Sequence, residues 1–304
     1  MIRADILAAL APIFLIIGAG LAMKRAGFPG EGFWLPAERL SYYVLLPAML
    51  IKEIGGAELG AFAIPPLLLA LVGTYLAASA VMLVLGPRLG FPPASFATAF
   101  MGSIRFNTYA GLAAVAALHG GGGLALFALV IAVMIPLLNV LSIAALVRHA
   151  GGLGVRAALA EIARNPFILG CVVGITINVA GFDLPSVAQG VLDILGRAAL
   201  GVALLVTGAG LTLRGLRTSL PLLGLASAVK LLALPVLVAV ACRLVGVGAF
   251  ETQVAVLYAA LPTSPAGFVL ARQLGGDTAL IAAIITATTV AAIATMPLML
   301  ALLR

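Results

Sequence analysis

Apolar segments long enough to cross a lipid bilayer follow one another along almost the whole chain, and this feature restricts the fold more than any other. A run of about 18 or more apolar residues with few charges marks a membrane-spanning helix. Only 9% of the 304 residues are charged and 63% are hydrophobic. Soluble domains are about one quarter charged. The sequence therefore predicts an all-α membrane protein that crosses the bilayer many times.

Glycine, proline and polar residues divide the apolar sequence into predicted spans. The breaks between them include HGGGG at 119–123 and a polar connection at 148–166. Ten spans result, at approximately 4–23, 37–54, 63–86, 94–118, 123–147, 166–181, 185–212, 219–245, 251–273 and 278–303. The first run ends at Lys24 and Arg25 and not at a cleavage site, so it predicts a transmembrane helix and not a signal peptide.

The lysines and arginines predict an orientation. With the N-terminus outside, ten of the 17 cations fall in cytoplasmic connections, four fall outside and three lie within spans. The ten are Lys24, Arg25, Arg39, Arg88, Arg148, Arg156, Arg164, Arg214, Arg217 and Arg272. Because cytoplasmic connections are enriched in positive charge, we expect a multi-pass inner-membrane protein with both termini outside the cytoplasm. The net charge of +7 then follows from these connections, and no nucleic acid partner is predicted.

Residues that commonly carry catalytic or metal chemistry are few in this chain. Cys171 and Cys242 both fall in apolar spans, which indicates neither a disulfide framework nor a metal site. His119 and His149 lie at span ends, and the sequence has no HExxH motif. An intramembrane enzyme is therefore disfavoured, and we predict no cofactor and no bound metal.

The two halves of the chain resemble each other. Pro12, Gly27 and Phe28 recur 154 residues later as Pro166, Gly181 and Phe182. YAGLAAVAALHGG at 109–121 matches PAGFVLARQLGGD at 265–277, with an offset of 156 residues. Five spans in each half force the second copy to be inverted in the membrane, and inverted repeats are typical of secondary transporters. We expect one five-helix repeat at 1–150 and a second at 151–304.

Two predicted spans, the fourth and the ninth, contain residues that interrupt a helix. The ninth carries Pro262 and Pro265 on either side of Thr263 and Ser264, and the fourth carries Asn107 and Thr108 at the corresponding place. Broken backbone inside a membrane is tolerated where it lines a cavity or contacts protein, and the N-termini of half-helices attract anions. The simpler alternative is a kink in each of two packed helices, but paired interruptions favour a binding site.

The sequence resembles the auxin efflux carrier family over nearly its whole length. The resemblance rests on APIFLIIGAGL in the first span, AERLSYYVLLPAMLI at 37–51, the Asn107–Thr108 pair, NPFILG at 165–170, AVKLLALP at 228–235 and ALPTSPAGFVLA at 260–271. It implies ten helices in two inverted repeats with crossing, broken helices 4 and 9. It also implies a scaffold of helices 1, 2, 6 and 7, a transport unit of helices 3–5 and 8–10, an elevator motion and a homodimer.

The same resemblance implies transport of a small organic anion. Plant members have a proline where this chain has Ala113, so auxin itself is not implied, and dicarboxylates such as malate or malonate are the better expectation. The predicted substrate-binding residues are Arg105, Asn107, Thr108, Tyr109, Lys230, Pro262, Thr263, Ser264 and Pro265.

Charged residues inside the spans are costly and therefore functional candidates. Arg105 is placed to grip a carboxylate, or else it extends to the membrane surface or pairs with a carbonyl group. Asp193 and Arg197 are four residues apart on one helix face, which favours a structural ion pair over a substrate contact. Lys230 is either a proton-responsive group or a fixed counter-charge. The surplus of Arg105 and Lys230 over acids favours an anionic substrate.

Other functions remain open at this point. A sodium-coupled organic anion symporter, as in the related bile-acid symporters, is the main alternative, and sodium dependence of uptake would separate the two. A channel is less favoured because nothing resembles a selectivity filter. Substrate identity and transport direction do not follow from the sequence.

Overall fold

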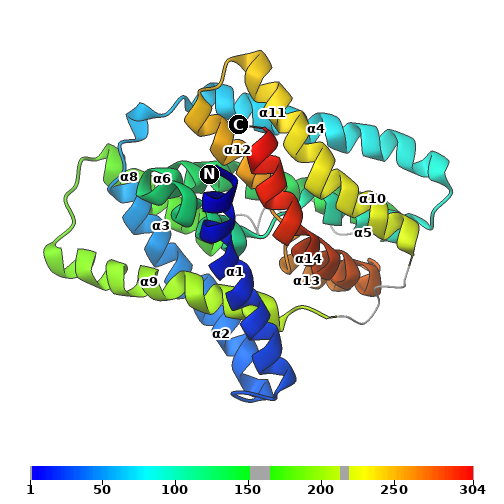
Figure 1. Cartoon of the computed structure of the whole chain (residues 1–304), viewed down its shortest axis with the longest axis horizontal. Coiled ribbons are helices and arrows are strands. Elements are labelled where there is room, and N and C mark those ends of the chain that lie inside the picture. Colours follow the sequence, from blue (N-terminus) through cyan, green and yellow to red (C-terminus); the bar gives the residue numbers. More distant parts are fainter. Residues whose placement is uncertain (1, 151–164, 213–218, 304) are drawn as a thin grey trace.

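The computed structural model describes residues 2–150, 165–212 and 219–303, and within these ranges the chain is helical and has no β-strand. This confirms the predicted all-α class. Figure 1 shows a compact assembly of helices that run in several directions. Among the described residues, six helical segments are long and apolar enough to cross a membrane: Asp5–Arg25, Ile64–Leu85, Pro93–Leu146, Ser186–Ala209, Leu220–Val245 and Thr278–Leu302.

Helix occupies each of the ten ranges predicted from the sequence, with several interruptions. The first half contains α1 (Ile2–Arg25), η1 (Glu31–Phe33), α2 (Trp34–Leu40), a π-helical turn η2 (Ser41–Leu45), α3 (Leu46–Gly55), η3 (Leu59–Ala61), α4 (Ile64–Leu85), η4 (Gly86–Leu89), α5 (Pro93–Ile104) and α6 (Thr108–Ala150). The second half contains α8 (Pro166–Val179), α9 (Ser186–Ala209), α10 (Leu220–Ala228), a π-helical turn η5 (Val229–Ala233), α11 (Leu234–Val245), α12 (Ala249–Ala260), α13 (Ala266–Gln273) and α14 (Thr278–Leu302).

The glycine-rich connection predicted at 119–123 is wrong in its extent. Helical structure runs on both sides of Gly120, and only this residue leaves the helical conformation, with φ 61° and ψ −153°. Glycine reaches this backbone conformation without a Cβ clash, so one residue is enough to redirect α6. Most of the polar connection predicted at 148–166 lies outside the described residues, as do four cations used to predict the orientation, Arg156, Arg164, Arg214 and Arg217.

One group of helices packs around α9, and its closest contact is made by two glycines. A Cβ atom at Gly20 of α1 would collide with the carbonyl oxygen of Leu205, and one at Gly208 of α9 would collide with that of Ile17. The two backbones therefore touch directly, which requires glycine on both helices. α3 packs against α8 and α9 and completes this group.

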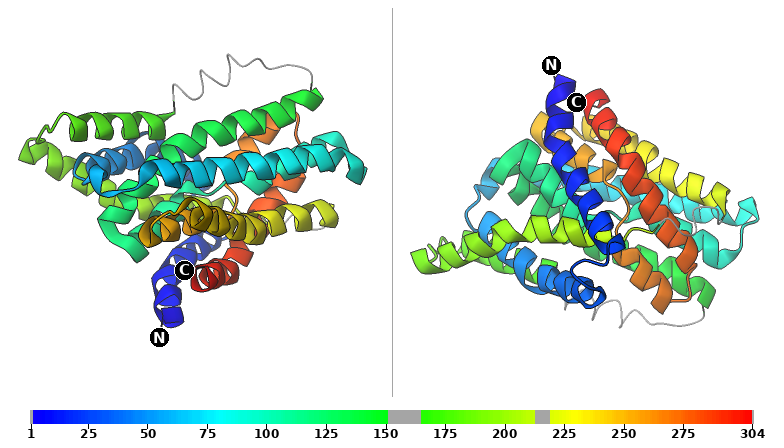
Figure 2. Two further views of the ribbon diagram at one scale, coloured as in Figure 1. Left: turned by 90° about the horizontal axis from the view of Figure 1, so that it is seen from above. Right: turned by 60° about the horizontal axis from the view of Figure 1, so that its bottom comes forward.

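The remaining helices pack mainly with one another. α11 lies against α4 and α12, and α10 lies against α5 and α14. The first and last helices, α1 and α14, are also in contact, and both views of Figure 2 show the two chain ends at the same end of the molecule. Many outward side chains are apolar, such as Leu15, Val187 and Leu244, each more than 70% exposed.

Candidate functional site

The first helix interruption separates α5 from α6. α5 ends at Ile104, residues 105–107 are not helical, and α6 begins at Thr108. The side-chain oxygen of Asn107 accepts hydrogen bonds from the backbone N–H groups of Tyr109 (3.1 Å) and Ala110 (3.2 Å). Asparagine is a favoured cap at this position because it satisfies N–H groups that have no partner in the first helical turn. The sequence thus restarts the helix where the structure shows it.

The second interruption separates α12 from α13. α12 ends at Ala260, and α13 begins at Ala266, directly after the second of the two prolines. Each proline lacks a backbone N–H, which helices need in their interior but not in their first turn. The hydroxyl oxygen of Ser264 accepts a hydrogen bond from the N–H of Ala266 (3.3 Å). Both interruptions occur where the sequence predicted them, and the first is limited to residues 105–107.

The two interruptions contact each other. The backbone N–H of Asn107 donates to the carbonyl oxygen of Pro262 (2.8 Å), and the Thr263 hydroxyl donates to the carbonyl oxygen of Gly102 near the end of α5 (2.7 Å). The Thr263 N–H donates to the hydroxyl oxygen of Thr288 on α14 (3.1 Å). Backbone groups released by the breaks are therefore satisfied within the protein, as an apolar environment requires.

A cavity of about 920 Å³ adjoins the two interruptions. Six of the predicted binding residues line it, namely Arg105, Asn107, Thr108, Tyr109, Ser264 and Pro265. The cavity runs from exposed residues at its mouth, such as Arg39 and Gln273, to buried residues such as Asn107 and Asn139. Three predicted binding residues do not line it: Lys230, Pro262 and Thr263.

The inner end of the cavity has a positively charged side chain, Arg105, and a hydrogen-bond donor without a partner among the described residues, the amide of Asn107. The guanidinium group of Arg105 donates from Nη1 to the side-chain oxygen of Asn139 on α6 (2.7 Å). Asn107 is 1% exposed, and its amide nitrogen Nδ2 has no hydrogen-bond partner among the described residues. A buried donor without a partner costs free energy, so this amide is suited to receive an acceptor atom from a ligand.

Lys230 lies in the π-helical turn η5 and is fully buried away from the cavity. Its ammonium group donates to the carbonyl oxygen of Ala259 in the last turn of α12 (3.0 Å) and to the hydroxyl oxygen of Tyr75 on α4 (3.4 Å). The carbonyl groups at the end of a helix lack helical partners and carry partial negative charge. Lys230 therefore supports the end of α12 just before the second interruption.

Asp193 on α9 forms ion pairs with two cations. One is Arg197, four residues later, and the other is Lys52 on α3. The sequence spacing suggested only the first pair, because the second depends on how α3 packs against α9. Both partners are partly solvent-exposed, and pairs of this kind contribute little stability.

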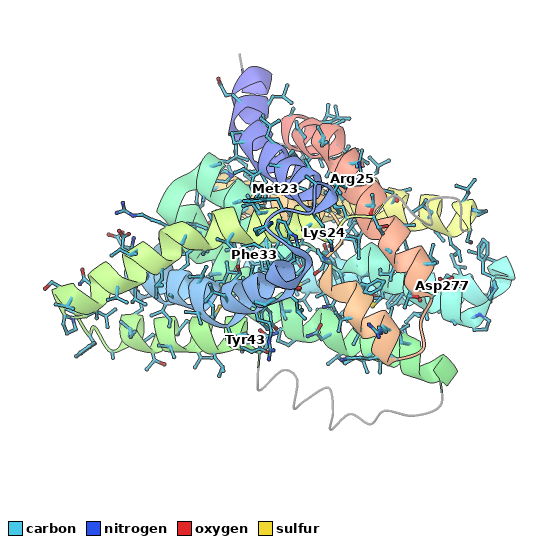
Figure 3. The ribbon with its side chains drawn as sticks, turned by 90° about the horizontal axis from the view of Figure 1, so that it is seen from below. Met23, Lys24, Arg25, Phe33, Tyr43 and Asp277 are labelled. Atoms are coloured by element: carbon cyan, nitrogen blue, oxygen red, sulfur yellow. The ribbon has the colours of Figure 1, made fainter. Side chains whose placement is uncertain are left out.

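Several cavity residues were not predicted from the sequence to bind the substrate. They come from α2 and its π-helical continuation (Leu35, Glu38, Arg39, Tyr42 and Tyr43), from α6 (Ile135, Leu138 and Asn139) and from the start of α8 (Asn165 and Phe167). Figure 3 shows Tyr43 on the lower face of the molecule in that view. Within the described residues, no group of three His, Cys, Asp or Glu side chains is arranged to hold a metal ion.

Interrupted helices that meet beside a cavity in an apolar helical protein are typical of membrane transporters. A family model described as "Membrane transport protein" matches residues 155–300. A protein of Rhizobium meliloti (strain 1021) named "Putative malonate transporter" is 29% identical over 323 residues, an alignment that covers 99% of this chain and 97% of the relative. Both matches are to membrane transport proteins, in agreement with the resemblance to the auxin efflux carrier family.

Proposed function

We propose that the chain is a secondary active transporter that carries a small organic anion, a carboxylate or dicarboxylate, through the cavity at the two interruptions. The observation that carries this proposal is that Arg105 and Asn107 line one cavity, and that the Asn107 amide nitrogen has no hydrogen-bond partner among the described residues. An anion that leaves water needs charge or donors to replace its hydration. The name of the Rhizobium meliloti relative supports a carboxylate as the cargo.

In this proposal each polar group has a distinct role. Arg105 binds a carboxylate by two parallel hydrogen bonds, and the Asn107 amide donates one more. The hydroxyl groups of Thr108 and Ser264 and the N-termini of α6 and α13 add further positive potential. Thr263 and Lys230 were predicted from the sequence to contact the substrate. In this proposal they hold the two interruptions in place, which is supported by their hydrogen bonds to the carbonyl groups of Gly102 and Ala259.

We further propose that access alternates by an elevator motion of one helix group against the other. The scaffold comprises five helices: α1, α2, α3, α8 and α9. The moving unit comprises α4, α5, α6 and α10 to α14. The packing of α1 and α3 on α9, and of α10 and α11 on α4, α5, α12 and α14, supports this division. The proposal includes ten spans in two inverted repeats and a homodimer formed through the scaffold.

The proposed orientation places both termini outside the cytoplasm, in the inner membrane. The cavity mouth then lies on the cytoplasmic side, because Arg39 and Gln273 belong to the end of the molecule assigned to the cytoplasm by the positive charges. The arrangement described here would accordingly be the inward-open one.

A binding screen tests the proposal. Ligands that bind only the folded state raise the melting temperature Tm. We expect malonate and other small carboxylates to raise the Tm of the purified protein in proportion to their concentration, whereas the uncharged amides of the same acids leave it unchanged. Equal effects of acids and amides, or no effect of any acid, would contradict anion transport.

A further inference from the structure

We infer that the carboxyl group of Glu38 ties anion binding in the cavity to the uptake of one proton. The inference rests on the proposed function, because it concerns the same cavity. Glu38 lines that cavity together with Arg105 and Asn107, and it is half-buried. A carboxyl group inside a cavity for carboxylates has no role in binding an anion while it remains ionised, so its presence needs an explanation.

The position of Glu38 follows from the geometry of α2. Leu35, Glu38 and Tyr42 are separated by three and four residues, which places them on one helix face, and all three line the cavity. The adjoining face, with Trp34 and Ala37, packs against Val206 and Ala209 of α9. Glu38 is therefore directed to the cavity by the burial of its apolar neighbours.

Charged and titratable side chains from several elements surround Glu38. The α9 segment packed on α2 contributes none of them, because its contact residues with α2 are apolar. Lys24 at the end of α1 and Tyr109 of α6 are close enough to interact electrostatically with Glu38, and Arg39, Tyr42 and Arg105 line the same cavity. Figure 3 labels Lys24, at the end of α1, and Phe33, which directly precedes α2. Burial of the carboxyl group opposes the ionised form of Glu38, whereas the positive charge of Lys24 favours it. In this inference Glu38 is ionised while the cavity is empty.

Anion binding changes this balance. A bound carboxylate beside Arg105 uses part of the positive charge that stabilised Glu38, and it adds a negative charge to the same half-buried space. Two carboxylates that share such a space cannot both stay ionised without a large cost, so one takes up a proton. The proton comes from the water at the cavity mouth and converts the Glu38 carboxylate to a carboxylic acid, and no other bond changes.

Protonation also gives Glu38 a useful contact. A carboxylic acid has an O–H donor, so the protonated group can hydrogen-bond the anion that it would otherwise repel. Release of that proton on the other side of the membrane restores the negative charge and favours release of the anion. Transport would then be coupled to the proton gradient, with one proton moving together with each anion.

Binding measured as a function of pH tests the inference. Between about pH 7 and about pH 9, aqueous carboxylates such as malonate stay ionised, so any pH dependence comes from the protein. For wild type we expect the malonate affinity to fall as pH rises, by up to about tenfold per pH unit for one coupled proton. Glu38→Gln should bind with an affinity that no longer varies with pH, because the amide is a permanent neutral donor.

Two controls make the test decisive. Glu53→Gln removes another half-buried carboxyl group, one that does not line the cavity, and should keep the wild-type pH slope. Proton uptake can also be read directly, by adding malonate at neutral pH to weakly buffered wild-type protein with a pH indicator. This measurement does not depend on the folding of a variant.

The outcomes separate the two proposals. Wild-type binding without a pH slope and without proton uptake would overturn the role of Glu38 and leave the anion cavity intact. A slope that persists in Glu38→Gln would overturn it as well. Failure of the wild type to bind any tested carboxylate at any pH would instead contradict the proposed function, and the inference would fall with it.

Discussion

The interruptions at 105–107 and 261–265 arise from corresponding places in the two halves of the sequence, yet their surroundings differ. Asn107 in the first presents an unpartnered amide to the cavity, beside Arg105. In the second, Thr263 is fully buried, and both its hydroxyl and its backbone N–H have protein partners. The first interruption is thus suited to bind a ligand, whereas the second is held within the protein.

The comparison shows how a membrane protein provides hydrogen-bond partners for the carbonyl groups at the ends of two broken helices. In each case a side chain from elsewhere donates to a carbonyl group near the end of the half-helix: Thr263 to Gly102 of α5, and Lys230 to Ala259 of α12. The second interruption therefore supports the first.

The largest effect on this comparison is expected from Arg105→Gln. The change removes the positive charge from the first interruption but keeps a polar side chain that can contact Asn139. Hydrogen bonds to charged groups contribute about 1.5–3 kcal/mol, so we expect malonate affinity to fall by about tenfold to about a hundredfold. Isothermal titration would measure it. Arg197→Gln, which removes an exposed cation far from the cavity lining, should bind as wild type does.

Thr263→Val should change stability more than binding. Valine keeps the shape of threonine but leaves the buried carbonyl group of Gly102 without its side-chain donor, at a cost of about 1–3 kcal/mol. The matched control is Thr289→Val, because the Thr289 hydroxyl bonds only to Ile285 of its own helix. A larger loss of Tm in Thr263→Val than in Thr289→Val would support the holding role. An unchanged Tm with lost affinity would place Thr263 in the binding site instead.

A smaller effect is expected from Lys230→Met. Methionine removes a buried charge whose desolvation is itself costly, so the overall Tm should change little. The carbonyl end of α12 loses its donor, and we expect faster amide hydrogen exchange at the second interruption and a malonate affinity reduced about tenfold or less. Exchange at the first interruption should stay as in wild type. A loss of affinity as large as in Arg105→Gln would show that Lys230 contacts the anion.

The sequence predicted the helical class and the positions of both interruptions, because prolines and an Asn cap act locally. The contribution of α2 to the cavity was not predicted, since Glu38 and Tyr42 reach it only through the packing of α2 on α9. The sequence also did not indicate that the Lys230 side chain lies outside the cavity. A π-helical turn places one extra residue in a turn and shifts the phase of a helix, and η5 contains Lys230.

The same limit applies to the ion pairs. Asp193 and Arg197 were paired from their spacing within one helix, whereas Lys52 comes from a helix more than a hundred residues earlier in the chain. Local sequence does not record which helix lies alongside another. Contacts of this kind follow from small residues such as Gly208, which set how closely two helices approach.

The central claim, that the first interruption binds the anion through an unused amide donor, is tested most directly by Asn107→Asp. Aspartate caps a helix as well as asparagine does, so α6 should still start at Thr108 and Tm should stay close to that of wild type. The donor is replaced by a negative charge, and we expect malonate affinity to fall by more than about tenfold. The reverse change at a cap outside the cavity, Asp277→Asn on α14, should leave binding unaltered. Wild-type affinity in Asn107→Asp would contradict the account.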